Sequence, residues 1–350
     1  NGYVSMVEMY LTVFNKENIK IRGYAMRKLL LGSTALAAAA SLGANTALAD
    51  VSISGAFEWA YTSMSSNIAA RDGTSSATDS EIAFKFSNKT DSGLTVGWVV
   101  ELESDDGNTA INESSMSIAG GFGKVVLGGN DSVGDNFGIA GTDIPSEEGG
   151  MTPSSATIMS NSDITPASGD SSKISYFLPA MGGLTMGVSH YTSLAGTTDS
   201  TEYGARYTMD AGGATVTIGG ASGTTEAATK DTDSQNVGVK IASGNITVAM
   251  GNGMYEANGE DRESTDFGVS YNMGNGLVVA AYTVDSDDSI DTGETYTRSG
   301  LELAYTIAPG LSAVINVDDF DYDAATGGGS INTTASDNGT SSKLTIKASF

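Results

Sequence analysis

One segment of the chain, from Asp131 to Asp170, concentrates carboxylates and contains no lysine or arginine. Its acidic residues are Asp131, Asp135, Asp143, Glu147, Glu148, Asp163 and Asp170. A concentration of one sign of charge attracts cations and pairs with basic side chains on whatever surface faces it. The segment also holds Pro145, Pro153 and Pro166, which fix φ and cannot donate to a sheet ladder. We therefore interpret residues 131–171 as a functional loop between two strands.

The residue types in the chain do not support a catalytic site or a cofactor-binding site. The chain has no cysteine, which excludes a disulfide framework, a zinc ribbon and a thiol nucleophile. Its single histidine, His190, shares an alternating face with Leu184, Met186 and Val188, where a general base meets no substrate. No nucleophile elbow and no phosphate-binding loop is present. We expect no enzyme and no bound cofactor.

Metal binding has one weak candidate in the sequence. The run from Asp285 to Glu294 has the carboxylate density of a calcium loop but lacks the glycine that an EF-hand requires at its sixth position. We expect at most adventitious Ca²⁺ on the acidic loops.

The overall charge excludes further classes of protein. The formal net charge is −25, which argues against a nucleic-acid partner and against a polybasic membrane anchor. The mean hydropathy is −0.08, and the one long apolar stretch lies near the N-terminus. A transmembrane β-barrel stays compatible with this profile, because its apolar residues alternate with polar ones.

The N-terminal region has the order of parts of a secretory signal peptide. Met26-Arg27-Lys28 is basic, Leu29 to Leu42 is apolar, and a small-residue cleavage site precedes Asp50. We expect residues 1–25 to lie upstream of the true start, residues 26–49 to be the signal peptide, and cleavage to fall between Ala49 and Asp50. Residues 50–350 then form the exported domain.

From Val51 onward the hydrophobic pattern has a period of two, which indicates strands with two different environments on their faces. Seven short glycine-rich turns alternate with eight longer polar connections, which predicts sixteen antiparallel strands. The last run alternates up to Phe350, so we expect it to pair with the first strand and close the sheet, because an open edge in lipid leaves backbone groups unpaired. The predicted fold is an all-β, 16-stranded antiparallel transmembrane barrel.

Alternation also sorts the charged residues, and it assigns most basic ones to the polar face that would line a lumen. The predicted basic wall is Lys85, Lys124, Arg206, Lys240, Arg298, Lys343 and Lys347, and the predicted lumen acids are Glu58, Glu101, Glu103 and Glu302. One interpretation is that these are solvated lumen side chains. The sharper one is that some, Lys85, Lys124 and Lys347 first, face the acidic loop across a constriction formed by Asp131, Asp135, Asp143, Glu147, Glu148 and Asp163. Because acids outnumber bases, we expect a preference for cations.

The signal peptide, the sixteen-strand pattern, the acidic third loop and the terminal Phe350 together resemble the general-diffusion porins of Gram-negative bacteria. The start Met26-Arg27-Lys28-Leu29 and the opening Asp50-Val51-Ser52-Ile53 resemble the alphaproteobacterial branch. Enteric members carry a Pro-Glu-Phe-Gly loop tip, which Asp135 to Gly138 matches only loosely. The resemblance implies a homotrimer in the outer membrane, in contact with lipid and lipopolysaccharide, that passes small hydrophilic solutes through a lumen narrowed by the third loop.

Two alternatives remain at this point. One is a secreted, acidic, β-rich surface or adhesion protein, against which the closing strand counts. The other is a substrate-specific outer-membrane channel.

Overall fold

The computed structural model describes residues 36–37, 50–103, 111–147, 162, 169–193, 198–227, 231–257, 260–288, 294–324 and 336–350. Within these ranges no helix is long and apolar enough to cross a membrane. The predicted cleavage residue Ala49 and the acids Glu148 and Asp163 lie outside the described residues.

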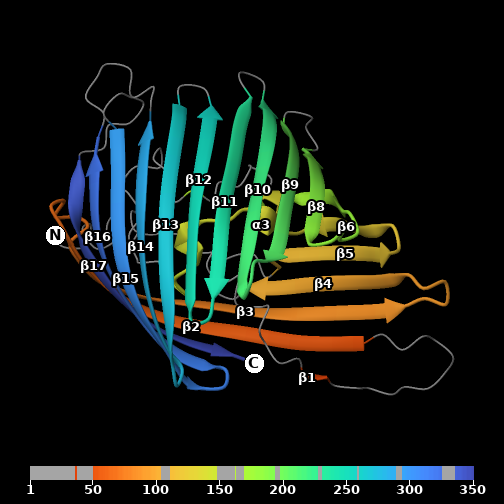
Figure 1. The fold of residues 1–350 in the computed structure, drawn as a ribbon, viewed down its shortest axis with the longest axis horizontal. Coiled ribbons are helices and arrows are strands. Elements are labelled where there is room, and N and C mark those ends of the chain that lie inside the picture. The colour runs from red at the N-terminus through yellow and green to blue at the C-terminus, as the bar shows by residue number, and fades with distance from the viewer. Residues whose placement is uncertain are drawn as a thin grey trace, which may run out of the picture.

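The chain forms long strands separated by short connections (Figure 1). In order they are β1 (Leu36–Ala37), β2 (Asp50–Ser66), β3 (Gly73–Lys89), β4 (Thr95–Glu103), β5 (Glu113–Gly120), β6 (Gly123–Gly129), β7 (Ser172–Phe177), β8 (Leu184–Thr192), β9 (Thr198–Asp210), β10 (Ala214–Ala227), β11 (Thr232–Ser243), β12 (Ile246–Ala257), β13 (Glu260–Gly274), β14 (Leu277–Asp288), β15 (Glu294–Ala308), β16 (Leu311–Asp323) and β17 (Asp337–Ser349). Between β6 and β7 lie the short helix α3 (Val133–Phe137) and the 3₁₀ turn η2 (Gly141–Asp143).

Among the described residues, the sixteen strands β2 to β17 form a closed antiparallel ring in which each strand pairs with its sequence neighbours. Closure is made by β17 and β2, where Lys347 lies opposite Glu58 and Ile346 opposite Trp59. The backbone of Phe350 exchanges two further hydrogen bonds with Gly55. The predicted barrel and its closing strand are therefore confirmed. The two-residue strand β1 lies within the predicted signal peptide and pairs with β2. Cleavage of the signal peptide stays a prediction.

The two faces of the ring differ as the alternation requires. One face, which we call the apolar face, carries large exposed hydrophobic side chains such as Phe57, Trp98 and Leu301. The other, the polar face, carries buried polar residues such as Glu202, Asp266 and Glu302. Large apolar groups stay exposed on a closed barrel where lipid takes the place of water, since every backbone group is already paired within the sheet.

The strands extend further than predicted into the long connections, and the connection between β12 and β13 is as short as the tight turn between β13 and β14. The first connection spans only residues 67–72, because β2 continues to Ser66 and β3 begins at Gly73. Asp285 to Asp288 belong to β14 and Glu294 begins β15, so both ends of the candidate calcium loop are strand, while residues 289–293 lie outside the described residues. Alternating residues such as Asp287 and Asp288 point to opposite faces of a strand, unlike the ligands of a compact loop.

Candidate functional site

The acidic segment after β6 contains no strand in its described part, residues 131–147, 162 and 169–171. Ser132 caps the N-terminus of helix α3. Its side chain accepts a hydrogen bond from the backbone N–H of Asp135, and the Asp135 carboxylate accepts one from the backbone N–H of Ser132. The Asp143 carboxylate likewise accepts from the backbone N–H of Ala140 in η2. Two of the predicted constriction acids thus fold the segment itself, through a reciprocal cap of the kind that satisfies a helix N-terminus.

Carboxylates on the polar face of the wall hold this segment by its backbone. Glu202 on β9 accepts from the N–H of Val133 at 2.9 Å. Asp266 on β13 accepts from the N–H of Gly141 at 2.7 Å and of Ser162 at 2.9 Å. These three donors have no partner within a strand, so the wall supplies the acceptors that buried N–H groups require.

The same arrangement continues on the following strands. Asn236 on β11 accepts from the N–H of Ile139 at 3.1 Å. Glu302 on β15 accepts from the N–H groups of Ser146 at 2.9 Å and Glu147 at 2.8 Å. The segment therefore runs along the wall from β9 to β15, with an anchor on every second strand. Glu302, predicted as an open lumen acid, is instead buried beneath the segment.

Glu147 ends this path between two lysines of β17. Its carboxylate lies 2.7 Å from Lys343 Nζ and is also ion-paired with Lys347. Glu58 on β2 completes the cluster at 3.8 Å from Lys343 and 3.6 Å from Lys347. Lys347, expected to face the acidic loop across a gap, contacts it directly, because the segment lies on this part of the wall. Two cations here balance two anions, and most of the cluster is buried.

The remaining predicted wall acids lie on β2 to β5 and are paired with other acids. Glu58 lies opposite Asp79, Glu81 opposite Glu103, and Glu101 opposite Glu113, all in direct cross-strand register. All six side chains are on the polar face. Lys85 on β3 lies on the same face. It is two residues from Ala83, and Ala83 lies opposite Glu101. Like charges directly opposite each other destabilise a sheet, so this wall is costly unless cations accumulate beside it.

The other predicted basic residues are scattered over the polar face. Arg206 donates to the Gly138 carbonyl at 2.7 Å and so also holds the segment. Lys124 lies over the ring of Phe177, and Arg298 is buried over the ring of Tyr282. Lys240 is exposed near the tight turn after β11. A single opposed row of basic residues is therefore not formed by the predicted set.

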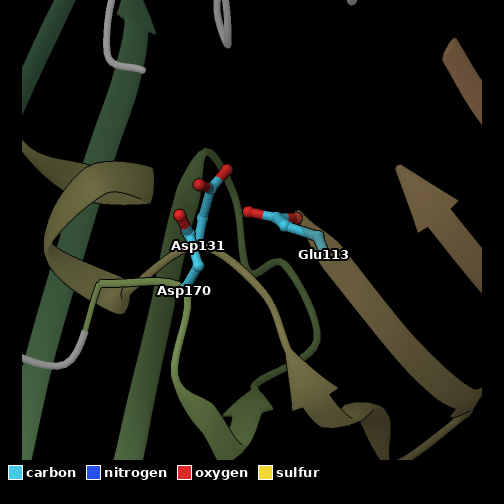
Figure 2. Close-up of side chains that lie close together, drawn as sticks. All are labelled: Glu113, Asp131 and Asp170. Carbon is cyan, nitrogen blue, oxygen red and sulfur yellow. The ribbon is translucent and has the colours of Figure 1, made fainter. Parts of the chain in front are cut away.

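Asp131 belongs to a separate group of acids at the start of the segment. One carboxylate oxygen from each of Glu113, Asp131 and Asp170 lies within 4.8 Å of the others, and the three side chains point toward one another from β5 and from the two ends of the segment (Figure 2). Oxygen ligands at this spacing are what Ca²⁺ prefers. Calcium binding stays a prediction.

The anchors Asn236 and Asn316 were missed by reasoning from sequence. Asn316 on β16 donates to the Glu147 carbonyl at 3.1 Å. Both are polar residues alternating with apolar ones, but so are many neighbours. Their partners are 97 and 169 residues away in the chain, and only the closed ring brings them together.

A closed antiparallel ring with an apolar face of large exposed side chains is the architecture of transmembrane β-barrels. Comparison with known proteins narrows the class. A model of the Gram-negative porin family matches residues 32–325. The chain belongs to the Gram-negative porin family, and family and fold together make it an outer-membrane channel protein.

Solved structures share this fold at low sequence identity. An anion-selective porin from Comamonas acidovorans is 16% identical, with a TM-score of 0.60 over 86% of this chain and 100% of its own. OmpT of Vibrio cholerae, described in a trimer form, is 14% identical, with a TM-score of 0.64 over 86% of this chain and 99% of its own. No curated protein matches the chain by sequence. Since one relative of the same fold is anion-selective, the sign of any selectivity has to come from this chain's own side chains.

Proposed function

We propose that the protein is a passive, water-filled, homotrimeric channel for small hydrophilic solutes and ions, with a preference for cations. The observation that carries the preference is the run of acid-on-acid register pairs across β2 to β5. On the neighbouring strand β17, two lysines are balanced by Glu147 and Glu58, so the pairs Glu81–Glu103 and Glu101–Glu113 carry the argument. The fixed charge that remains to act on a solute beside this wall is therefore mainly negative.

The second part of the proposal is that the polar face lines the lumen and that the acidic segment narrows it. In support, the side chains that hold the segment between Val133 and Glu147 lie on the polar face of β9, β11, β13 and β15 and on β17. The open path then runs between the segment and the acidic wall. The sequence suggested a field between an acidic row and an opposed basic row. In this proposal the acidic segment and the wall of β2 to β5 both attract cations, and Lys85 on that wall is a local exception.

A trimer and export by a cleaved signal peptide complete the proposal. The trimer is supported by the trimer form of the Vibrio cholerae relative, which shares the fold. Export is supported by the order of basic, apolar and small residues before Asp50. Protein isolated from the outer membrane of a Gram-negative host that expresses the full chain should begin at Asp50.

The test is planar-bilayer recording on that isolated protein, with a KCl gradient to read the sign of the reversal potential. We expect insertion steps in groups of three and a cation-selective potential that weakens as salt rises, because the Debye length falls from about 30 Å at 0.01 M to about 3 Å at 1 M. Anion selectivity would refute the proposed preference for cations but not the proposal that the protein is a channel. Absence of conductance from inserted protein would refute the channel itself.

The residues responsible are tested by a matched pair of variants. Glu81→Gln removes one charge from the acidic wall, and we expect its reversal potential to move toward zero in dilute KCl. Asp319→Asn removes one charge from an exposed position on the apolar face of β16 and should leave the potential unchanged. Equal effects from the two variants would show that net charge, and not the wall of β2 to β5, sets the preference.

A further inference from the structure

Six consecutive strands each place a glycine on the polar face beneath the acidic segment. The set, which we call the glycine track, is Gly187 on β8, Gly204 on β9, Gly219 on β10, Gly238 on β11, Gly251 on β12 and Gly268 on β13. Gly187 lies opposite Gly204, and Gly238 lies opposite both Gly219 and Gly251. Gly204 lies opposite Ala221, two residues from Gly219. Gly251 lies opposite Asp266, two residues from Gly268.

The track glycines are not required by backbone conformation. None of the six has a positive φ, although thirteen glycines elsewhere in the described chain do. Glycine inside a strand weakens it, because it has no side chain to pack and loses more backbone entropy on folding. Six such positions in adjacent strands therefore need another reason, and the usual one is the close approach of another group to the strand.

The approaching group is the acidic segment, through its backbone at four of the glycines and through the Phe137 side chain at Gly187 and Gly204. A Cβ at Gly219 would lie 2.5 Å from the carbonyl oxygen of Phe137, and one at Gly251 would lie 2.6 Å from that of Ile139. A Cβ at Gly238 or Gly268 would overlap the carbonyl oxygens of Ile139 and Gly141. Real Cβ contacts are essentially never under 3.0 Å, so no other residue fits without moving the segment.

We propose that the glycine track determines the cross-section of the channel, and thereby the upper size of the solutes that pass. The anchors Glu202, Asn236 and Asp266 fix where the segment lies along the wall, and the track fixes how closely it lies against it. Every ångström of separation from β8 to β13 is taken from the open path beside β2 to β6. This inference rests on the proposed function, because only a channel has a cross-section to set.

The geometry gives a lower limit for the displacement that one methyl group causes. A Cβ at Gly251 starts at 2.6 Å from Ile139 O, so the segment must move by at least 0.4 Å to reach 3.0 Å, and by 0.8 Å to reach the ordinary contact distance of 3.4 Å. The barrel wall behind the glycine is a hydrogen-bonded sheet that cannot retreat without breaking its ladder. The segment moves instead, away from the wall and into the open path.

The experiment measures single-channel conductance and the largest polyethylene glycol that still lowers it, in protein isolated from outer membranes. The variants are Gly238→Ala, Gly251→Ala and their combination. The control is Gly55→Ala, a strand glycine on β2 whose added Cβ would meet its nearest neighbour at an ordinary 3.5 Å. We expect a stepwise loss of conductance and a smaller polymer limit in the track variants, with Gly55→Ala like wild type.

A milder pair of substitutions keeps the test decisive if those variants fold poorly. A Cβ at Gly204 would have only side chains as its nearest neighbours, Phe137 at 2.6 Å and Val133 at 2.8 Å. Gly204→Ala should lower conductance, and adding Phe137→Ala should restore part of it, because the double variant removes the 2.6 Å contact with the Phe137 ring but keeps those with Val133 and with the Cβ of residue 137. Heat-modifiable mobility on gels confirms folded barrels.

The outcomes separate the two proposals. Track variants that conduct like Gly55→Ala would overturn the inference while leaving the channel intact. A loss of conductance in Gly204→Ala that Phe137→Ala does not lessen would also overturn it. Absence of conductance from inserted wild-type protein would overturn the proposed function, and this inference with it.

Discussion

Removal of the Glu147 charge is the sharpest single test of how the acidic segment is held. In the folded protein two lysines of β17, Lys343 and Lys347, are balanced by Glu147 and Glu58. Glu147→Gln keeps the shape of the side chain but leaves an excess of one positive charge in a cluster whose side chains are 1–16% exposed. The nearest remaining carboxylate, Glu58, lies at 3.6 Å and 3.8 Å from the two ammonium groups.

The magnitude follows from the burial of the cluster. Removing one partner of a buried ion pair costs about 3–5 kcal/mol, because the other charge stays desolvated and uncompensated. Lys343 retains some exposure and Glu58 remains close, so we expect the lower end, about 3 kcal/mol. The same excess positive charge lies beside the acidic wall of β2, so cation preference should also fall.

Both effects are measured on one preparation. Urea unfolding in detergent can be followed by tryptophan fluorescence, because Trp59 lies opposite Ile346 in the closing strand pair. Reversal potentials in a KCl gradient report the selectivity. Asp319→Asn on the apolar face serves as the control. An unfolding midpoint and a reversal potential equal to those of the control would refute the role of Glu147 as the charged attachment of the segment to β17.

Three further predictions concern single residues of the wall and of the acidic segment. Asp266→Ala removes an acceptor shared by Gly141, Thr142, Ser162 and Gly251. The free energy of unfolding in urea should fall by more than about 1–3 kcal/mol, the usual penalty for one unsatisfied buried donor, and an unchanged midpoint would contradict this. Leu301→Arg puts a charge on the apolar face and should cost about 2–4 kcal/mol if the residue lies near the membrane midplane, whereas Leu301→Met should be neutral. Asp131→Asn relieves repulsion with Asp170 and should raise stability at low ionic strength, with the gain lost in 1 M salt; a gain that persists at high salt would point to a cause other than charge.

The fold could be predicted from the sequence because its determinants are local. Alternation over each strand and glycine-rich turns such as the one at Gly93 depend on a few neighbouring residues, and they indicate strand number, antiparallel order and closure by Phe350. The boundaries were less accurate: β14 continues through Asp288, because acidic residues can remain in register with β13 when the strand extends past the apolar band.

The site was predicted only in part, since it depends on register around the whole ring. Alternation placed Glu302 and Lys347 on the polar face correctly, but it could not show that the segment covers both. Nor could it distinguish Asn236, an anchor, from other polar residues of β11. The one signal that was available and unused is the glycine on the polar face of each strand from β8 to β13, which marks the path of the segment across the wall.

The attachments of the acidic segment also order the events of folding. Its contacts reach forward along the chain, from Glu202, 69 residues after Val133, to Lys347, 201 residues after Ser146. Bringing residues so far apart in the chain together costs conformational entropy before any contact forms. The last attachment also forms only after β17 has joined the sheet. The segment therefore cannot take its final place while the barrel is being assembled. A barrel caught before closure would be wider than the finished one, with its acidic segment still open to proteases.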